Sequence, residues 1–246
     1  MPTKHEESPP PVPDDELEAS RREMQVLVRA VSHDFRAPLR AITTFGGLLG
    51  EQSSELDGPL AESVHHMVSA AERLEAMVEG WLALARADDG TPAVEVPLST
   101  VIASIRQRVE PLLTERNGTL TVGPLGMVVG RVAQLTKLFG ALIDNAILYS
   151  EGPPKVTVEG RTDDGYLVVS VRDEGIGFEP RYLERIFELF QRLHSADEYP
   201  GVGAGLAVSR KIAQLHGGRI TATSSPGDGA VFDVWLPVAG AAPQSP

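Results

Sequence analysis

Apolar residues in the first third of the chain recur at alternating steps of three and four. One such series is Val28, Val31, Phe35, Pro38, Ile42, Phe45 and Leu49, and a second series runs from Leu60 to Ala85. This heptad spacing predicts two long amphipathic helices. Because the turn-forming residues Leu56-Asp57-Gly58-Pro59 separate the two series, the pattern predicts an antiparallel helical hairpin over residues 17–90.

Each predicted helix carries only a narrow apolar stripe. One hairpin leaves these stripes half exposed, whereas two hairpins related by a two-fold axis cover them in a four-helix bundle. The pattern therefore predicts a homodimer. A coiled-coil spacer without any chemistry would have the same seam, so the seam alone leaves both interpretations open.

After the sequence Asp88-Asp89-Gly90-Thr91-Pro92, signals for strands and helices alternate. Helical periodicity predicts helices over residues 99–116, with Ser99 as N-cap, 132–149 and 206–216. Runs of β-branched and aromatic residues predict strands over residues 119–122, 155–162, 166–172, 219–225 and 231–236, and Asp163-Asp164-Gly165 is typical of a hairpin turn. We expect a second domain over residues 93–238, with a helical layer on one face of a largely hairpin-connected sheet, so the fold class is α+β.

Composition excludes several classes of function. The chain has 246 residues, no cysteine, and 34 acidic residues against 22 basic ones. The acidic excess weighs against nucleic acid as a partner, and the lack of cysteine excludes disulfides, thiolate zinc sites and cysteine nucleophiles. No run approaches the roughly 18 apolar residues of a membrane span, and the first 16 residues do not resemble a signal peptide. We therefore expect a cytoplasmic protein without membrane insertion.

The first 16 residues are acidic and rich in proline. The run Pro9-Pro10-Pro11-Val12-Pro13 favours extended polyproline geometry, so residues 1–16 are predicted to form a disordered arm, and residues 239–246 a disordered tail.

His33 occupies an f position of the first heptad series, which faces solvent. A packing role of His33 in the core is therefore excluded. The remaining alternative to a functional role is a neutral histidine on the surface. Pro38 lies in the same predicted helix, where a proline costs about 3 kcal/mol unless a bend is useful. A bend beside an exposed histidine favours a functional role for His33.

Two glycine-rich motifs in the second domain could contact a ligand. Asp173-Glu174-Gly175-Ile176-Gly177 follows a predicted strand, where a carboxylate can accept from an exocyclic amine and glycines let the backbone approach a flat ring. Residues 201–205, Gly-Val-Gly-Ala-Gly, precede a predicted helix, whose free amides suit phosphate. An ordinary turn and a glycine hinge are the respective alternatives. Neither motif has the spacing of a dinucleotide-binding fingerprint or a P-loop.

Residues between and before these motifs complete the candidate site. Residues 187–200 resemble a mobile lid. Asn145 and Tyr149 share one face of the predicted helix 132–149. The amide oxygen of Asn145 could hold Mg²⁺, and the ring of Tyr149 could flank a nucleotide. Asn145 could also be an ordinary polar residue on an exposed helix face.

Five motifs, taken in order, resemble the H, N, G1, F and G2 boxes of sensor histidine kinases. They are Ser32-His33-Asp34-Phe35-Arg36-Ala37-Pro38-Leu39, Asp144-Asn145-Ala146, Asp173-Glu174-Gly175-Ile176-Gly177, Phe187-Glu188-Leu189-Phe190 and Gly203-Ala204-Gly205-Leu206. The match spans about residues 20–238, and the sequence around residues 191–201 is most similar to the phytochrome-type subgroup. The resemblance implies a dimeric four-helix bundle followed by an α/β sandwich ATP-binding domain of the gyrase/Hsp90/histidine kinase type.

The resemblance also implies a cytoplasmic kinase that phosphorylates its own His33 with ATP and passes the phosphoryl group to an aspartate of a response-regulator receiver domain. Asp34 would hold and deprotonate the His33 ring. By the same resemblance, Asn145 would ligate Mg²⁺, Asp173 would bind the adenine amino group, Gly175 and Gly177 would admit the ring, and Arg192 would neutralise charge on the γ-phosphate. Gly203 and Gly205 would turn the lid near the phosphates. The expected place of Tyr149 beside the nucleotide comes from its helix face.

Three positions depart from the family pattern. Ala141 replaces a second asparagine, Leu148 replaces a lysine, and Ala37 replaces the Thr or Asn that would orient water for phosphatase action. The first two departures favour an alternative function, a dimeric phosphotransfer or adaptor protein with a degenerate ATP site that acts through a partner. A non-kinase ATPase of the same superfamily is disfavoured, because the hairpin with His33 would then have no purpose.

The predicted arm and tail leave no room for the sensor domain that the resemblance would imply. The signal is therefore expected from a partner such as a separate sensor protein, from the arm, or from a missing part of the chain.

Overall fold

The computed structural model describes residues 41–45, 48, 63–64, 66–71, 74, 77–78, 80, 82, 92–194, 198–199 and 201–238. The predicted nucleophile His33, its neighbour Asp34, Ala37 and Pro38 lie outside the described residues. The predicted arm and tail, residues 1–16 and 239–246, lie outside them as well.

The described residues between 41 and 82 are all helical, in agreement with the two predicted helices. Of the seam residues among them, Ala71 is buried, whereas Phe45 is 67% exposed and Leu74 is 52% exposed. One chain therefore leaves part of its apolar seam uncovered.

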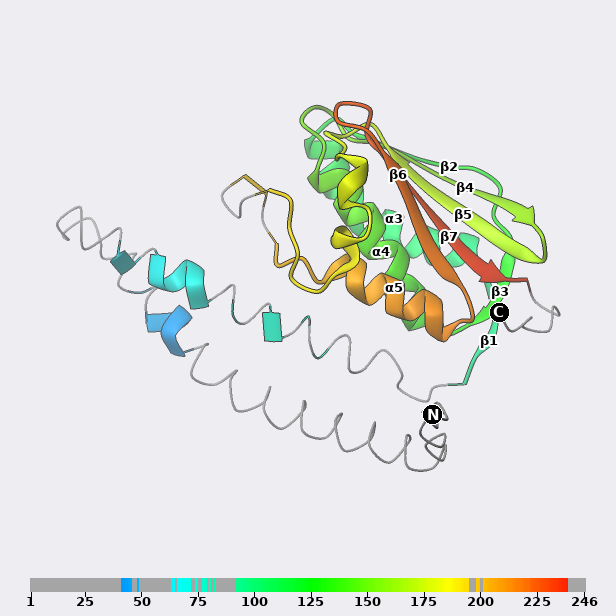
Figure 1. Cartoon of the computed structure of the whole chain (residues 1–246), viewed down its shortest axis with the longest axis horizontal. Helices are drawn as coiled ribbons and strands as arrows, with labels where there is room; N and C mark the ends of the chain where they lie inside the picture. The colour runs from blue at the N-terminus through cyan, green and yellow to red at the C-terminus, as the bar shows by residue number, and fades with distance from the viewer. Residues whose placement is uncertain are drawn as a thin grey trace, which may run out of the picture.

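A five-stranded sheet in the order β2-β4-β5-β7-β6 organises the second part of the chain (Figure 1). Its strands are β2 (Thr119–Val122), β4 (Lys155–Asp163), β5 (Tyr166–Asp173), β6 (Arg219–Ser224) and β7 (Ala230–Pro237). β2 runs parallel to β4, and the other neighbouring pairs are antiparallel, so the prediction of a largely antiparallel sheet is confirmed.

Two further strands, β1 (Val94–Pro97) and β3 (Met127–Gly130), form a separate antiparallel pair. The sequence analysis did not predict them. Each has only four residues and includes a proline or a glycine, which weakens the strand signal in the sequence.

Helices α3 (Leu98–Glu115), α4 (Val132–Leu148) and α5 (Gly205–Leu215) cover one face of the five-stranded sheet (Figure 1). Leu135, Phe139 and Ile143 of α4 are fully buried in one hydrophobic core with Val169 and Val171 of β5. Burying each such side chain contributes roughly 1.5–3 kcal/mol. Among the described residues, no helix combines the length and apolar character that crossing a bilayer requires.

The turn between β4 and β5 is the predicted hairpin. Asp164 (φ 43°) and Gly165 (φ 78°) both adopt positive φ between the paired residues Asp163 and Tyr166. Positive φ at both central residues is typical of a type I′ turn, whose twist matches that of the strands. The hairpin signal of the sequence is therefore confirmed.

The predicted N-cap of the first helix in this region is wrong. α3 begins at Leu98, its N-cap is Pro97, and no side chain caps it. The N–H group of Leu98 instead donates to the carbonyl oxygen of Gly126 at 3.1 Å. A tertiary contact thus satisfies the N–H group of the first helical residue, and the helix begins one residue before the predicted cap.

The opposite face of the sheet carries a row of cationic and aromatic side chains. Arg219, Trp235, Val168 and Arg161 are neighbours across β6, β7, β5 and β4. The guanidinium groups of Arg219 and Arg161 lie 4.1 and 5.9 Å from the centroid of the Trp235 ring. Val168 is fully buried yet does not belong to the main core, so these long side chains shield it from water on this face.

His216 joins the end of α5 to the segment that precedes α4. Its Nε2 accepts from the backbone N–H of Arg131 at 3.1 Å, so Nδ1 carries the proton and donates to the carbonyl oxygen of Ile212 at 2.8 Å. Burial is the largest cause of a lowered pKa of His216. The fold therefore favours the neutral ring.

This geometry predicts a stability that depends on pH. As pH falls below about 6.5, the unfolded chain protonates His216 while the folded chain resists, so the free energy of unfolding should decrease. His216→Gln should cost about 1–2 kcal/mol at pH 7.5 through lost hydrogen bonds and should flatten this pH dependence. Urea unfolding at pH 7.5 and 5.5, followed by Trp235 fluorescence in a Trp81→Phe background, measures both effects.

His66→Gln, at an exposed histidine of the hairpin, is the control. An equally steep pH dependence in His216→Gln would contradict the prediction.

Candidate nucleotide-binding site

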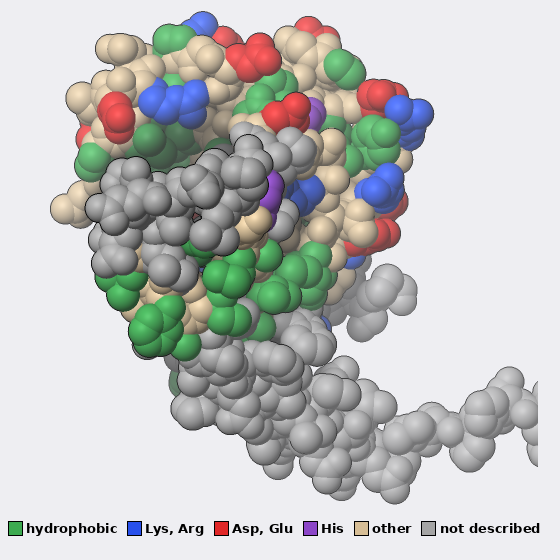
Figure 2. All heavy atoms as spheres, turned by 90° about the vertical axis from the view of Figure 1, so that its left-hand side faces the viewer, with side chains coloured by type: hydrophobic (Ala, Val, Ile, Leu, Met, Phe, Trp, Pro, Cys, Tyr) green, Lys and Arg blue, Asp and Glu red, His purple; other side chains and the backbone are tan. Residues whose placement is uncertain are grey.

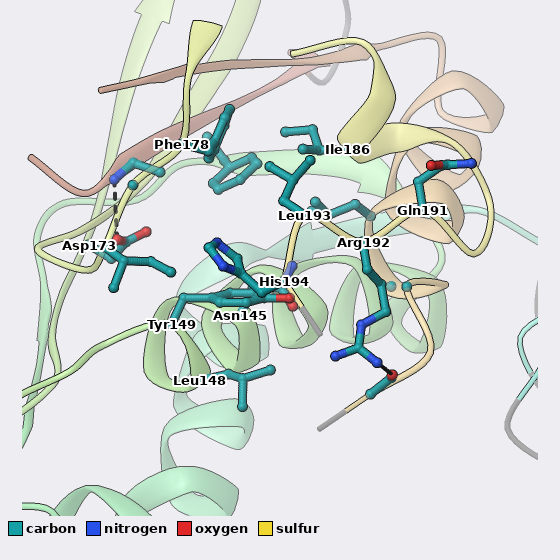
Figure 3. Close-up of a pocket in the computed structure, with 18 of the residues that line it drawn as sticks. Asn145, Leu148, Tyr149, Asp173, Phe178, Ile186, Gln191, Arg192, Leu193 and His194 are labelled. Carbon is teal, nitrogen blue, oxygen red and sulfur yellow. Dashed lines mark hydrogen bonds between the residues drawn. The ribbon is translucent and has the colours of Figure 1, made fainter. Parts of the chain in front are cut away.

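Side chains from several elements surround one cavity of about 240 Å³ (Figure 3). They come from the second half of α4, the end of β5, the 3₁₀ turn η3 (Arg185–Phe187), the segment that connects η3 to α5, and β7. The predicted site residues that line the cavity are Asn145, Tyr149, Asp173, Gly177, Arg192, Gly203 and Gly205. The fold therefore brings together motifs that are far apart in the sequence.

Asp173, the last residue of β5, provides a buried carboxylate at one end of the cavity. Its Oδ1 accepts hydrogen bonds from the N–H groups of Gly175 at 2.9 Å and Ala230 at 3.2 Å. Oδ2 accepts none from the part of the chain that the structure describes. Burial raises the pKa of Asp173, and the two backbone hydrogen bonds oppose this rise. Oδ2 can therefore accept from an amino group of a bound ring.

Two glycines allow the backbone to fold closely around Asp173. A Cβ at Gly175 would lie 2.5 Å from the carbonyl oxygen of Tyr149. Gly177 has a φ of +62°, and a Cβ there would overlap the carbonyl oxygen of Ser225. Gly177 lines the cavity, whereas Gly175 does not. The N–H group of Gly175 supports the carboxylate of Asp173, and a direct role of Gly175 beside a ring stays a prediction.

The C-terminal half of α4 supplies Asn145, Leu148 and Tyr149 to the cavity. Asn145 is partly buried there, which disfavours the alternative of an ordinary residue on an exposed face. Leu148 adds apolar surface where the family pattern has a lysine. The described residues contain no cluster of three or more His, Asp or Glu that could hold a metal ion. Asn145 could thus contribute one amide oxygen to Mg²⁺, with the remaining ligands supplied by phosphates and water.

Arg192 brings a positive charge to the segment that connects η3 to α5. Its guanidinium group donates to the carbonyl oxygen of Gly201 at 2.7 Å (Figure 3). It also donates to the carbonyl oxygen of Tyr199. In the same segment, the N–H group of Phe190 donates to the carbonyl oxygen of Gly203 at 3.0 Å. These bonds hold the glycine-rich stretch against the cavity.

Figure 2 shows acidic and basic side chains interspersed over one face of the molecule, with hydrophobic side chains gathered in its lower part. No broad field of one sign covers this face. The charge at the cavity therefore comes from individual side chains, chiefly Asp173 and Arg192.

Several lining residues were not assigned from the sequence. Ile176, Phe178 and Phe232 form apolar parts of the wall, and His194 lies beside Tyr149. Phe232 belongs to a strand with ordinary alternation, so nothing in its sequence context separates it from a core residue. His194 lies within residues 187–200, the predicted lid, but no role was predicted for it from the sequence.

Arg116, after the end of α3, fastens the end of α4. Its guanidinium group donates to the carbonyl oxygens of Ile147 at 2.7 Å, Ser150 at 2.5 Å and Gly152 at 3.3 Å. A cation is favourable there, because the last carbonyl groups of a helix have no partner within it. Tyr149 lies between these carbonyl groups, so Arg116 helps to position it.

Comparison with known proteins gave matches to two family models. Residues 23–90 match the His Kinase A (phospho-acceptor) domain. Residues 130–240 match the histidine kinase-, DNA gyrase B- and HSP90-like ATPase. The chain is 34% identical to cyanobacterial phytochrome A of Nostoc sp. over 92% of its length, and 33% identical to the sensor histidine kinase MtrB of Mycobacterium leprae over 85%. It spans 30% and 38% of these two relatives.

Solved structures give a similar result. Full-length ShkA, crystallised in complex with AMPPNP, matches 89% of the chain with a TM-score of 0.64 and 24% identity, and 47% of ShkA is covered. The mycobacterial sensor histidine kinase MprB matches 59% of the chain with a TM-score of 0.52 and 26% identity, and 97% of that chain is covered. The ShkA match supports the fold alone.

Arg116→Ala should lower the free energy of unfolding by about 2 kcal/mol, because three carbonyl groups lose a charged donor. Arg116→Lys should restore part of the loss, since an ammonium group cannot reach all three acceptors in the same geometry. Urea unfolding measures the change. Arg106→Ala is the control, because Arg106 lies exposed on α3, the helix that Arg116 follows, and makes one long ion pair of 3.9 Å. Equal stabilities of the two alanine variants would contradict the assigned role.

Proposed function

Because the chain belongs to the sensor histidine kinase family, we propose that it phosphorylates its own His33 with ATP and passes the phosphoryl group to an aspartate of a response-regulator receiver domain. The proposal includes a cytoplasmic location, where ATP is available. The family match confirms the resemblance found in the sequence, and the fold class is confirmed as well. The finer statements rest on the residues below.

The observation that carries the proposal is the shared cavity of Asp173, Asn145, Tyr149 and Arg192. It combines a carboxylate acceptor in an apolar wall with an amide oxygen and a cation. The acceptor suits the adenine amino group, and the amide and the cation suit Mg²⁺ and phosphate oxygens. The same chain also matches the phospho-acceptor domain, which includes His33.

In the proposed reaction, a ring nitrogen of His33 attacks the γ-phosphorus of ATP. The bond between this phosphorus and the bridging oxygen breaks, ADP leaves, and Asp34 accepts the ring proton. Mg²⁺, when bound, neutralises phosphate charge, while Arg192 can stabilise charge on the γ-phosphoryl group. The phosphoryl group then moves from the ring nitrogen to a carboxylate oxygen of the regulator.

The proposed kinase is a homodimer. Phe45 and Leu74 of the heptad seam are exposed in a single chain, and a second hairpin would bury them in a four-helix bundle. His33 would lie on the outer surface of that bundle, as its f position requires.

A dimeric adaptor with a degenerate ATP site is the second candidate. Leu148, in the cavity, places an apolar side chain where the family has a lysine, and Ala141 packs beside Gly205 instead of offering an amide. Both features weaken contacts to phosphate or metal, while the contact to adenine through Asp173 is retained. Nucleotide binding therefore distinguishes the two candidates.

The kinase proposal predicts acid-labile label on the protein after incubation with γ-labelled ATP and Mg²⁺. His33→Ala should reduce this label to background, because the accepting nitrogen is lost. His66→Ala, on the second helix of the hairpin, should leave it unchanged. Label that survives His33→Ala, or no label on the wild type despite a correct fold, would contradict the proposal.

Asp173 predicts a pH-dependent affinity for ATP. The affinity should fall as pH decreases through its raised pKa, because a protonated carboxyl group no longer accepts from the adenine amino group. Asp173→Asn should weaken binding about 10- to 100-fold at pH 7.5 and remove this part of the pH dependence. Isothermal calorimetry at several pH values measures both effects.

The same substitution should not destabilise the fold. A folded pKa raised above the unfolded value means that the ionised Asp173 lowers stability at pH 7.5, so removing its charge should maintain or raise the melting temperature. Asp163→Asn, in the exposed hairpin, is the control for binding. Wild-type affinity in Asp173→Asn, or undetectable ATP binding by the wild type, would favour the adaptor.

A further inference from the structure

We propose that Tyr199 is a positioning residue of the nucleotide site, which holds the rings of Tyr149 and His194 and, through its backbone carbonyl, the guanidinium group of Arg192. This inference rests on the proposed binding of ATP in the cavity. It assigns a function to a residue of the connecting segment that does not itself line the cavity.

Three rings form a closed triangle at the side of the cavity. The centroid of the Tyr199 ring lies 5.0 Å from that of Tyr149 and 5.4 Å from that of His194, while Tyr149 and His194 are 6.1 Å apart. The contact of His194 with Tyr199 is edge-to-face, and the other two are tilted. Such separations are favourable for aromatic pairs. Removing Tyr199 would therefore remove two of the three contacts.

The triangle connects two different parts of the cavity wall. Tyr149 belongs to the framework, because its backbone carbonyl accepts from the N–H group of Ile176 at 3.0 Å and its own N–H group donates to Asn145. His194 and Tyr199 belong to the segment between η3 and α5. Tyr199 thus fastens this segment to the end of α4, where the two lining rings meet.

The backbone of Tyr199 makes a second connection. Its carbonyl oxygen and that of Gly201 accept hydrogen bonds from the two terminal nitrogens of Arg192. A phosphate oxygen would compete with these carbonyl groups for the same donors. The placement of Tyr199 therefore also decides where the charge of Arg192 is held.

Ordinary core packing does not account for Tyr199. The residue is only partly buried, and it belongs neither to the hydrophobic core nor to the partly buried residues packed against it. Its ring contacts are instead with the two cavity-lining rings. A purely structural role would predict a loss of stability, whereas a positioning role predicts a loss of nucleotide affinity.

The test uses the full chain with the substitutions Tyr199→Ala and Tyr199→Phe. Tyr166→Ala is the matched control, since Tyr166 is a partly exposed tyrosine that contacts Trp235 on the opposite face of the sheet. Three quantities are measured: the Kd for fluorescent ATP, the KM and kcat of autophosphorylation, and the NMR shift of the His194 ring proton without nucleotide. His194→Gln identifies this resonance.

Tyr199→Ala should raise Kd and KM about tenfold with little change in kcat, which corresponds to two lost aromatic contacts. Tyr199→Phe should stay within about twofold of the wild type, because it keeps the ring. The His194 resonance should move in Tyr199→Ala and not in Tyr166→Ala, because a ring-current source is removed only from the triangle.

An unchanged Kd in Tyr199→Ala, when the wild type binds ATP, would overturn this inference and leave the proposed function standing. An unmoved His194 resonance would also overturn it. A Phe variant as weak as the Ala variant would overturn it by assigning the effect to the hydroxyl group. If the wild type binds no ATP, the proposed function fails first, and this inference fails with it.

Discussion

Close approach of backbones at the carboxyl end of β5 is the constraint on which the site depends. Gly175 lies against the carbonyl group of Tyr149, and Gly177 against that of Ser225, at separations that leave no room for a Cβ. The N–H group of Ile176 donates to Tyr149, and the N–H group of Ala230 reaches Asp173. One short turn thereby fixes α4, β5 and β7 relative to one another, and the cavity lies between them.

The two charged groups of this cavity, Asp173 and Arg192, affect the stability of the free protein and the binding of a ligand differently. Burial makes the ionised carboxylate of Asp173 costly, as its raised pKa indicates, and only one of its oxygens is bonded to the described backbone. Arg192 is bonded to carbonyl groups of its own segment. A ligand with an amino group and phosphates would satisfy the first group and compete for the second. The proposed function would therefore use interactions that the fold leaves incomplete.

Much of the fold was accessible from the sequence, because it depends on local pattern. The apolar period of α4 and the Asp-Gly turn between β4 and β5 gave correct elements. The start of α3 was misjudged at Ser99, because the N–H group of Leu98 is satisfied by Gly126, a residue remote in sequence. β1 and β3 were missed for a similar reason, since such short strands depend on pairing with segments remote in sequence.

The sequence by itself determined the order of the motifs, the residue types that can bind an adenine nucleotide, and the heptad seam that one chain cannot cover. These properties are carried by composition and spacing along the chain. Only the tertiary structure decided that Arg116 fastens the end of α4, that the N–H group of Ala230 reaches Asp173, and that Tyr199 packs on Tyr149 and His194. These decisions depend on distances between residues remote in sequence, which arise when helices and strands pack.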